Sequence, residues 1–349
     1  MKGIHHLLHQ LASQGASDLH ISEGTRPRLR IHGELSDMEH PIINQRTMTE
    51  YLQALVTPRR FKKFMANGDL DFAWEWDGVA RFRANYFISQ RGMGAVFRLV
   101  PEHVVPFGRL MLPNTIIKFT QRKSGLILLT GPTGSGKSTT LASMIDYINN
   151  TRPAHIITIE DPIEFVHSRK KSYLSQREIG THTPTFSAAL KAALREDPDV
   201  MMVGELRDQE ATSLSLTAAE MGFLVMATLH TGSAGKTVNR VVDMFPTGRR
   251  AVVRQQLAST LIGVISQTLV KRTDGQGRVP ACEVLVATPQ LRSMIREGAT
   301  HQIPSAFQQG ASVGCQTMDQ SIIQLLRKRL ISRQEAKDRL IDKTLLHSA

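Results

Sequence analysis

The segment Gly131-Pro132-Thr133-Gly134-Ser135-Gly136-Lys137-Ser138-Thr139 is the most informative part of this chain for its architecture. It matches the pattern G-x-x-x-x-G-K-S/T of a P-loop, or Walker A motif, and it lies between the apolar run 126–129 and a segment of helical character. Its glycines let the backbone wrap around a phosphate, and the N–H groups at the start of the next helix attract anionic oxygens. In such a loop Lys137 reaches the β- and γ-phosphates of a nucleoside triphosphate, and the Ser138 hydroxyl binds Mg²⁺.

Short apolar runs separated by segments of helical character predict the architecture around this loop. The runs are 126–130, 156–159, 200–203 and 225–229. Continuous apolar strands of this kind indicate a sheet that is covered on both faces, and therefore a doubly wound α/β domain with the P-loop after an early strand. Ligands of such domains bind at the carboxyl ends of the strands.

Three of these predicted strands end in side chains suited to nucleotide chemistry. One is followed by Glu160-Asp161-Pro162-Ile163-Glu164, in which a carboxylate could orient a water at the γ-phosphate. Another is followed by Gly204-Glu205, where glycine occupies the usual aspartate position of a Walker B strand and leaves Glu205 to act on Mg²⁺ or its waters. The last is followed by His230-Thr231, a polar pair that could sense the phosphate. A single acid after a strand is more often a helix cap or a solvated loop residue, and the spacing leaves open which carboxylate is the base.

The first hundred residues follow a different pattern. Apolar residues recur at helical spacing from Ile4 to Ala12, and short strands are predicted at 18–21 and 29–31, with a turn at His32-Gly33. Apolar and polar residues then alternate on both sides of Asp77-Gly78, which predicts a β-hairpin. Together these patterns predict a small α+β domain built on an antiparallel sheet.

Arginines project from this predicted sheet. Arg81 and Arg83 share the face opposite Phe82, because side chains alternate along a strand, and Arg98 follows on another apolar stretch. Arginines beside a nucleotide domain can neutralise γ-phosphate charge in trans. From the pattern alone, a role in surface solubility is the more common one.

Proline and glycine punctuate the connection between these two patterns, at Pro101, Pro106, Gly108 and Pro113. We therefore expect an N-terminal domain at 1–100, a hinge or linker at 101–113 and an ATPase domain at 114–349.

After His230 the sequence predicts mainly helices. One is marked by Val238, Val241 and Val242, a longer one by Val253, Leu257, Leu261, Ile265 and Leu269, and a helical tail extends over 318–346.

The composition limits the class of protein. A chain of 349 residues is long for one core, so two globular domains are expected. It has no apolar run near the roughly 20 residues that span a bilayer, and no signal-peptide core at its start. Its only cysteines, Cys282 and Cys315, are typical of a reducing compartment and too few for a four-thiolate zinc site. These features favour a cytoplasmic protein without zinc.

The net charge of +12 indicates a basic surface, which could meet nucleic acid, an anionic membrane or an acidic protein. Aromatic residues make up only 5%, and none of the segments interleaves them with Lys or Arg as a single-strand binding platform would. We therefore expect a protein or membrane-surface partner rather than a specific nucleic acid. In a single cluster such as Arg327-Lys328-Arg329, a solvated helix face is the more common interpretation.

Taken together, these motifs resemble the bacterial type II/type IV secretion ATPases over nearly the whole chain, and within them the twitching-motility retraction ATPases. Besides the P-loop, the matching stretches are Ala16-Ser17-Asp18-Leu19-His20, Arg81-Phe82-Arg83, Phe97-Arg98, the Asp box Ile159-Glu160-Asp161-Pro162-Ile163-Glu164, the Walker B region Arg195-Glu196-Asp197-Pro198-Asp199 with Gly204-Glu205-Leu206-Arg207-Asp208, and the His box Thr228-Leu229-His230-Thr231.

The resemblance implies an α/β protein with an N-terminal PAS-like α+β domain and a C-terminal RecA-like P-loop NTPase domain that carries a helical C-terminal extension. It implies a homohexameric ring with ATP between subunits. By the same resemblance, Glu164 looks like the general base and Glu205 like the Mg²⁺-associated acid. Arg83 and Arg98 look like the arginines that approach the phosphates from the N-terminal domain.

The resemblance to the retraction branch depends on two features. Extension and type II secretion motors of this superfamily usually carry a four-cysteine zinc insert, which this chain lacks. Leu291-Arg292-Ser293-Met294-Ile295-Arg296-Glu297 is similar to the A-I-R-N-L-I-R-E segment associated with pilus retraction. We therefore expect a motor that drives pilus retraction at the cytoplasmic face of the inner membrane, with an inner-membrane platform protein and a paralogous pilus ATPase as partners.

Several alternatives share these motifs. An accessory paralogue of the retraction motor, or an ATPase that exports protein or transfers DNA, would have the same nucleotide residues. A nucleotide-gated structural regulator of the pilus base is the alternative that is not an enzyme. The retained strand-end acids and His230 argue against that last reading.

Overall fold

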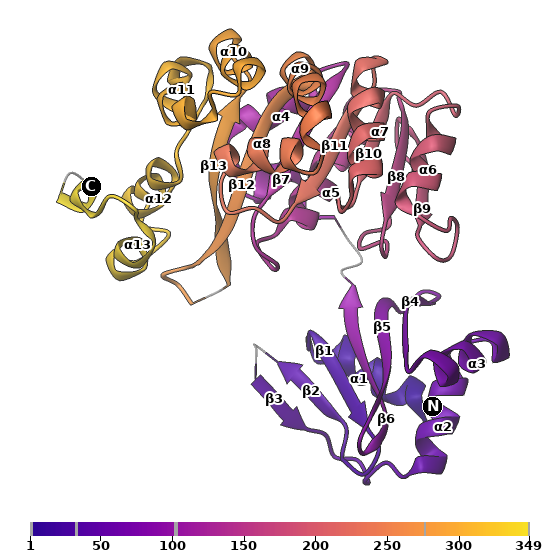
Figure 1. Cartoon of the computed structure of the whole chain (residues 1–349). Helices are drawn as coiled ribbons and strands as arrows, with labels where there is room; N and C mark the ends of the chain where they lie inside the picture. Colours follow the sequence, from indigo (N-terminus) through magenta and orange to yellow (C-terminus); the bar gives the residue numbers. More distant parts are fainter. Residues whose placement is uncertain (1–2, 32–33, 101–103, 276, 348–349) are drawn as a thin grey trace. The chain divides into compact units, whose positions relative to one another are not determined.

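A computed structural model describes residues 3–31, 34–100, 104–275 and 277–347 (Figure 1). The chain divides into two compact units, one comprising residues up to 103 together with 162–166, the other comprising 104–161 and 167–349. The predicted turn at His32-Gly33 and the first part of the predicted hinge, 101–103, lie outside the described residues.

The first unit is built on an antiparallel sheet with the strand order β3-β2-β1-β6-β5-β4. The strands are β1 (Asp18–Ser22), β2 (Arg28–Ile31), β3 (Glu34–Asp37), β4 (Asp69–Trp76), β5 (Ala80–Ser89) and β6 (Gly92–Val100). The helices are α1 (Ile4–Ser13), α2 (Gln45–Gln53) and α3 (Pro58–Asn67). The predicted opening helix, the hairpin and the antiparallel sheet are therefore confirmed.

One face of this sheet packs on the helices and forms the core of the unit. Along β5 the buried side chains are Phe82, Ala84 and Tyr86, as expected for a strand with one face covered. The hydroxyl of Tyr86 donates to the carbonyl oxygen of Leu52 in α2 at 3.1 Å. This face is apolar, and the arginines of β5 and β6 therefore lie on the other one.

The second unit is built on a sheet with the strand order β13-β12-β7-β11-β10-β8-β9. The strands are β7 (Gly125–Thr130), β8 (His155–Glu160), β9 (Tyr173–Glu178), β10 (Val200–Val203), β11 (Leu224–Leu229), β12 (Leu261–Lys271) and β13 (Arg278–Val286). Neighbouring strands run parallel, except that β13 pairs antiparallel with β12 at one edge.

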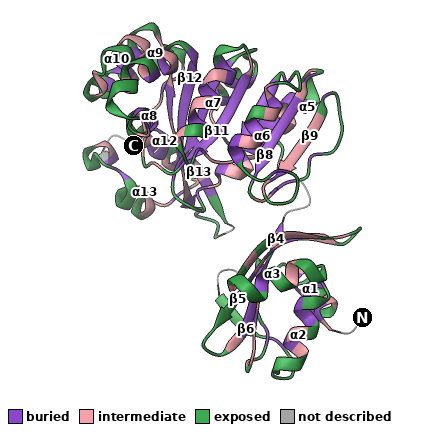
Figure 2. Ribbon diagram, turned by 45° about the vertical axis from the view of Figure 1, so that its right-hand side comes forward, coloured by how far each residue is buried: buried purple, intermediate pink, exposed green. Residues whose placement is uncertain are grey.

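The second unit has helices on both faces of its sheet and two more on the β12–β13 ribbon. They are α4 (Asn114–Thr120), α5 (Lys137–Thr151), α6 (Phe186–Ala193), α7 (Gln209–Glu220), α8 (Ala234–Asp243), α9 (Arg250–Thr260), α10 (Pro289–Glu297), α11 (Ile303–Gln309), α12 (Met318–Arg327) and α13 (Arg333–Arg339), with short 3₁₀ helices at Phe107–Arg109, Thr247–Arg249, Thr300–Gln302, Ala311–Val313 and Lys343–His347. Side chains of α4 and α5 pack on one face, and those of α6 to α11 on the other. Figure 2 shows the central strands buried between these helices.

The prediction of one long helix over Val253 to Leu269 is wrong. Only α9 is helical there, and residues 261–271 form β12, which lies beside β7. The five apolar residues recur every four positions, and four is a multiple of the strand period as well as close to the helical one. The residues between them, such as Ile262 and Val264, are also apolar and buried, as in a strand covered on both faces.

The C-terminal tail is helical, as predicted, in α12 and α13. Both helices pack against Val270, Val279 and Ala281 of the β12–β13 ribbon. In the described parts of the chain, no helix is both long enough and apolar enough to cross a bilayer.

Candidate functional site

The P-loop occupies the turn between β7 and α5. Gly131, Gly134 and Gly136 all have positive φ (142°, 76° and 86°), a backbone conformation that side chains with a Cβ rarely adopt. A Cβ at Gly131 would also lie 2.2 Å from the carbonyl oxygen of Gln267. The glycines are therefore required by the path of this loop.

The side chain of Lys137 binds the backbone of the P-loop that contains it. The Nζ of Lys137 donates to the carbonyl oxygens of Gly131 (2.8 Å) and Pro132 (3.0 Å), and Lys137 is buried. The hydroxyl of Ser135 is buried too, and among the described residues it has no hydrogen-bond partner. A phosphate group is an acceptor that suits both the buried hydroxyl and the lysine.

Glu205 follows the carboxyl end of β10 and is the centre of a charged network. Arg207 donates from Nε to Glu205 Oε2 (2.8 Å) and from Nη1 to Asp161 Oδ2 (3.1 Å). His230, which follows β11, places Nε2 3.2 Å from Glu205 Oε1. The hydrogen bond with Glu205 raises the pKa of Arg207 further, so this side chain stays charged. The structure therefore brings Glu205 and His230 together, as the strand-end argument expects.

Arg207 is absent from the set of site residues predicted from the sequence. A signal was present, because the arginine lies two residues after Glu205, but an arginine in a loop is ordinary and the pattern does not show its partners. Its guanidinium carbon also lies 5.8 Å from the centre of the Phe186 ring, which contributes a cation–π contact.

The carboxylates of the Asp box have different environments. Glu160 is buried, and its Oε1 accepts hydrogen bonds from Thr158 (2.7 Å) and Gln176 (3.3 Å). Asp161 pairs with Arg207. Glu164 belongs to the segment 162–166, which groups with the first unit. One oxygen of Glu160 and one oxygen of Asp161 therefore have partners within the second unit.

Arg83 and Arg98 are directly opposite each other on β5 and β6. Asp18 on β1 is the next residue in the same row and is opposite Arg98. The Nε of Arg98 donates to Asp18 Oδ1 at 2.8 Å, and Ser17 donates to the other carboxylate oxygen, Oδ2, at 2.8 Å. Burial alone would raise the pKa of Asp18, but these hydrogen bonds and the Arg98 charge outweigh it and lower the pKa. The carboxylate is therefore ionised and fixes one edge of the Arg98 guanidinium, while the Arg98 side chain stays 65% exposed.

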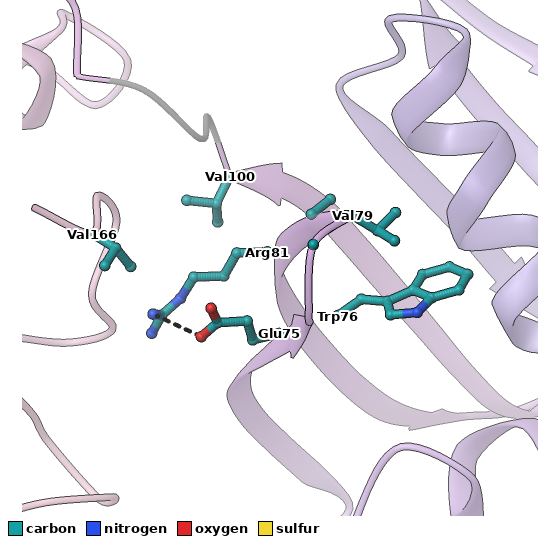
Figure 3. Close-up of a pocket in the computed structure, with 8 residues that line it drawn as sticks. Glu75, Trp76, Val79, Arg81, Val100 and Val166 are labelled. Atoms are coloured by element: carbon teal, nitrogen blue, oxygen red, sulfur yellow. Dashed lines mark ion pairs between the residues drawn. The ribbon is translucent and has the colours of Figure 1, made fainter. Parts of the chain in front are cut away.

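Arg81, the other arginine of β5, lines a pocket in the first unit. The β4–β5 hairpin lines it together with Val100 and with Val166 of the segment 162–166 (Figure 3). Within this pocket, Arg81 Nη1 lies 3.7 Å from Glu75 Oε2 and forms an ion pair with it (Figure 3). The charge of Arg81 is therefore paired within the β4–β5 hairpin.

Hydrogen bonds join β7, which precedes the P-loop, to the residues that follow its neighbour β11. The hydroxyl of Thr130, the last residue of β7, donates to the carbonyl oxygen of Thr231 at 2.7 Å, and the Thr231 N–H donates back to it at 2.8 Å. Because β7, β11 and β10 are neighbours in the sheet, the P-loop, His230 and Glu205 follow strand ends at one edge. Glu164, Arg83 and Arg98 belong to the other unit.

Oxygen donors are available for Mg²⁺. Ser138 is in the first turn of α5 and is partly exposed, and the Glu205 side chain is 24% exposed. A hydroxyl and a carboxylate are hard oxygen ligands, and Mg²⁺ usually takes only one or two of these from protein, with phosphate and water as the others. The residues present fit this ion.

The chain is similar to known proteins over nearly its whole length. The family model described as Type II/IV secretion system protein matches residues 1–338. The "Type IV pilus retractation ATPase PilT" of Pseudomonas aeruginosa is 48% identical over 328 residues, which cover 94% of this chain and 95% of the relative. The "Type IV pilus ATPase PilU" of the same organism is 34% identical over 330 residues, covering 95% and 86%.

Among solved structures, one described as "Crystal Structure of the Pilus Retraction Motor PilT and Bound ADP" covers 100% of both chains. Its TM-score is 0.91, and its sequence is 42% identical.

Proposed function

Because the chain belongs to the Type II/IV secretion system protein family, we propose that it is an ATP-hydrolysing motor that drives retraction of a type IV pilus. The observation that carries this proposal is the complete P-loop, with its buried Lys137, at the same sheet edge as the Glu205–His230 pair. Full-length similarity to a retraction ATPase and to an ADP-bound retraction motor supports it.

The proposed architecture follows the family. The N-terminal domain (1–100) is PAS-like, the ATPase domain (114–349) is RecA-like, and 101–113 is the hinge between them. Six copies form a homohexameric ring with ATP between subunits. The ring works in the cytoplasm, against an inner-membrane platform protein of the pilus, and a paralogous pilus ATPase is a further partner.

In the proposed mechanism, ATP phosphates displace the Gly131 and Pro132 carbonyls from Lys137, which then contacts the β- and γ-phosphates. Ser138 and Glu205 would hold Mg²⁺, which would supply positive charge to the phosphates. Glu164 acts as the general base that orients the attacking water, and His230 senses the γ-phosphate through Glu205.

Movement is proposed to come from the first unit. Arg83 and Arg98 approach the phosphates when this unit closes on the nucleotide, and hydrolysis releases them. Asp18 orients the Arg98 guanidinium for this role, because its carboxylate accepts the hydrogen bond from Nε. The two terminal nitrogens of Arg98 are then the donors proposed to bind an anion.

The identities favour a retraction ATPase over a paralogous pilus ATPase, because the chain is 48% identical to the pilus retractation ATPase PilT and 34% identical to the pilus ATPase PilU. The helix α10, which contains the retraction-associated segment, buries Leu291 and Ile295. Its Arg292 donates to the carbonyl oxygens of Ser259 (2.9 Å) and Leu261 (2.7 Å) and so holds α10 against the end of α9.

Pilus retraction in a deletion strain of the source bacterium tests this function. We expect the deletion to abolish retraction, and a plasmid copy of the wild-type gene to restore it. The variant Glu164→Gln should bind ATP but fail to restore retraction, because an amide cannot accept the proton of the attacking water. The matched control is Glu220→Gln, at an exposed position on α7. Normal retraction in the deletion strain, or with Glu164→Gln, would contradict the proposal.

A further inference from the structure

A buried glutamine that belongs to none of the recognised motifs braces the P-loop. Gln267 lies on β12, one residue beyond the last pair that β12 forms with β7, Ser266 with Thr130. It is therefore located where the P-loop leaves the sheet. Its side chain is almost completely buried.

Both ends of the Gln267 amide are used, each on a different part of the nucleotide site. The Nε2 donates to the carbonyl oxygen of Ser135 in the loop (2.8 Å), and the Oε1 accepts from the hydroxyl of Thr140 in α5 (2.8 Å). Among neutral side chains of this length, only an amide offers a strong donor and a strong acceptor together in this way. One side chain thus sets the loop and the start of the helix at a fixed distance from β12.

The hydrogen bond to Ser135 has a consequence for the next N–H group. The peptide unit between Ser135 and Gly136 is planar and trans, so its C=O and N–H point in opposite directions. Because the carbonyl is held by Gln267, the N–H of Gly136 is directed away from β12. N–H groups of such a loop are the donors that bind phosphate.

The same residue accounts for two of the P-loop glycines. A Cβ at Gly131 would lie 2.2 Å from the Gln267 carbonyl oxygen, and a Cβ at Gly136 would lie 2.8 Å from Gln267 Nε2. The close approach of β12 therefore excludes larger residues from both positions, in addition to their positive φ.

From this geometry we infer that Gln267 is a positioning residue of the nucleotide site, which sets nucleotide affinity by orienting the P-loop N–H groups. This inference rests on the proposed function only as far as nucleotide binding at the P-loop. It concerns groups that contact the phosphates ADP and ATP share, so it predicts a change in affinity for both nucleotides.

The test is ADP binding by the purified full-length protein, measured by isothermal titration calorimetry with Mg²⁺ present. Gln267→Met keeps the side-chain length but removes both hydrogen bonds, and we expect the Kd for ADP to rise about tenfold or more. Gln267→Glu keeps an acceptor for Thr140 but loses the donor to Ser135, and should weaken binding at least as much. Thr268→Val is the matched control, because its side chain lies on the opposite face of β12 and should leave Kd within about twofold of wild type.

A second set of measurements separates positioning from a general loss of packing. The KM for ATP should rise with the Kd for ADP, while kcat at saturating ATP changes by less than about threefold, since the bound loop regains its geometry. Thr140→Val should weaken binding less than Gln267→Met, and the double variant should be no weaker than Gln267→Met alone, because both act through one amide.

Binding of ADP within twofold of wild type by Gln267→Met would overturn the inference. If that variant fails to fold, Gln267→Glu and Thr140→Val decide in the same way, and unchanged affinity in both would overturn it. A fall in kcat without a change in Kd would also contradict it. Failure of the wild-type protein to bind ADP would instead contradict the nucleotide site itself.

Discussion

His167 is a buried histidine whose surroundings favour the neutral ring. Its backbone N–H donates to Gln176 Oε1 at 2.9 Å, and its ring nitrogen Nδ1 is buried without a hydrogen-bond partner among the described residues. Burial is the main cause that lowers the pKa of His167, to about 4, with the Asp146 charge opposing it and the Lys170 charge adding to it.

This lowered pKa predicts how stability depends on pH. Below pH 6.5 the unfolded chain binds a proton at this ring, while the folded protein does so only near pH 4. The free energy of unfolding should therefore be highest above pH 6.5 and fall as the pH drops from 6.5 to 4, by on the order of 3 kcal/mol from this residue. Urea unfolding across this range checks it. His167→Asn should flatten the slope relative to wild type, whereas the exposed control His6→Asn should not. Equal slopes for wild type and His167→Asn would refute this assignment.

The position of a single residue could be predicted from the sequence where a local motif determines it. It could not be predicted where it depends on a contact with a residue far away in the chain. The P-loop residues and Glu205 are read from local patterns that dictate both backbone and chemistry. The role of Gln267 could not be predicted, because it depends on a contact between positions that are distant in the chain. The environments of Glu160 and Asp161 are likewise set by partners from other strands and loops.

At the scale of elements, the sheet of the first unit holds an arginine with one observed role and one proposed role. Arg98 is a candidate phosphate ligand, and it is also the ion-pair partner of the buried Asp18. Arg83 is opposite it, in the same row of the sheet. Loss of activity in a variant of Arg98 could therefore come from either role, and stability has to be measured alongside activity.

We expect Arg98→Ala to lower the free energy of unfolding by about 1–2 kcal/mol, because it leaves the Asp18 carboxylate buried without its ion-pair partner, with a discount for the exposure of Arg98. Arg83→Ala, the matched control on the neighbouring strand, should change stability by less than about 0.5 kcal/mol. Urea unfolding at pH 7 compares the two. An equal loss of stability in both variants would contradict the pairing seen in the structure.

Elements were predictable where the hydrophobic period is unambiguous. The hairpin around Asp77-Gly78 alternates strictly, and the buried strands β7, β8, β10 and β11 are short apolar runs that precede helices. For β12, in contrast, spacing by four residues fits a helix and a strand equally, and only its place beside β7 decides between them. The pairing of β12 with β7 also determines where Gln267 lies. Because the sequence predicts a helix here, it does not indicate that Gln267 lies beside the P-loop.

At the scale of the whole molecule, the candidate residues are divided between two units. The P-loop, Glu205 and His230 belong to the second unit, and Glu164, Arg83 and Arg98 to the first. Local motifs predict the first group, whereas the roles of the second group are implied only by the resemblance to the secretion ATPases.

ATP hydrolysis at the P-loop is the reaction on which the proposed motor depends. The measurement that tests it is steady-state phosphate release by the purified full-length protein with ATP and Mg²⁺. We expect turnover by the wild type, and a loss of about 100-fold or more in Lys137→Ala, because the substitution removes the positive charge that contacts the transferred phosphoryl group. Lys123→Ala, at an exposed lysine before β7, should retain the wild-type rate. Phosphate release by Lys137→Ala at the wild-type rate would contradict the account.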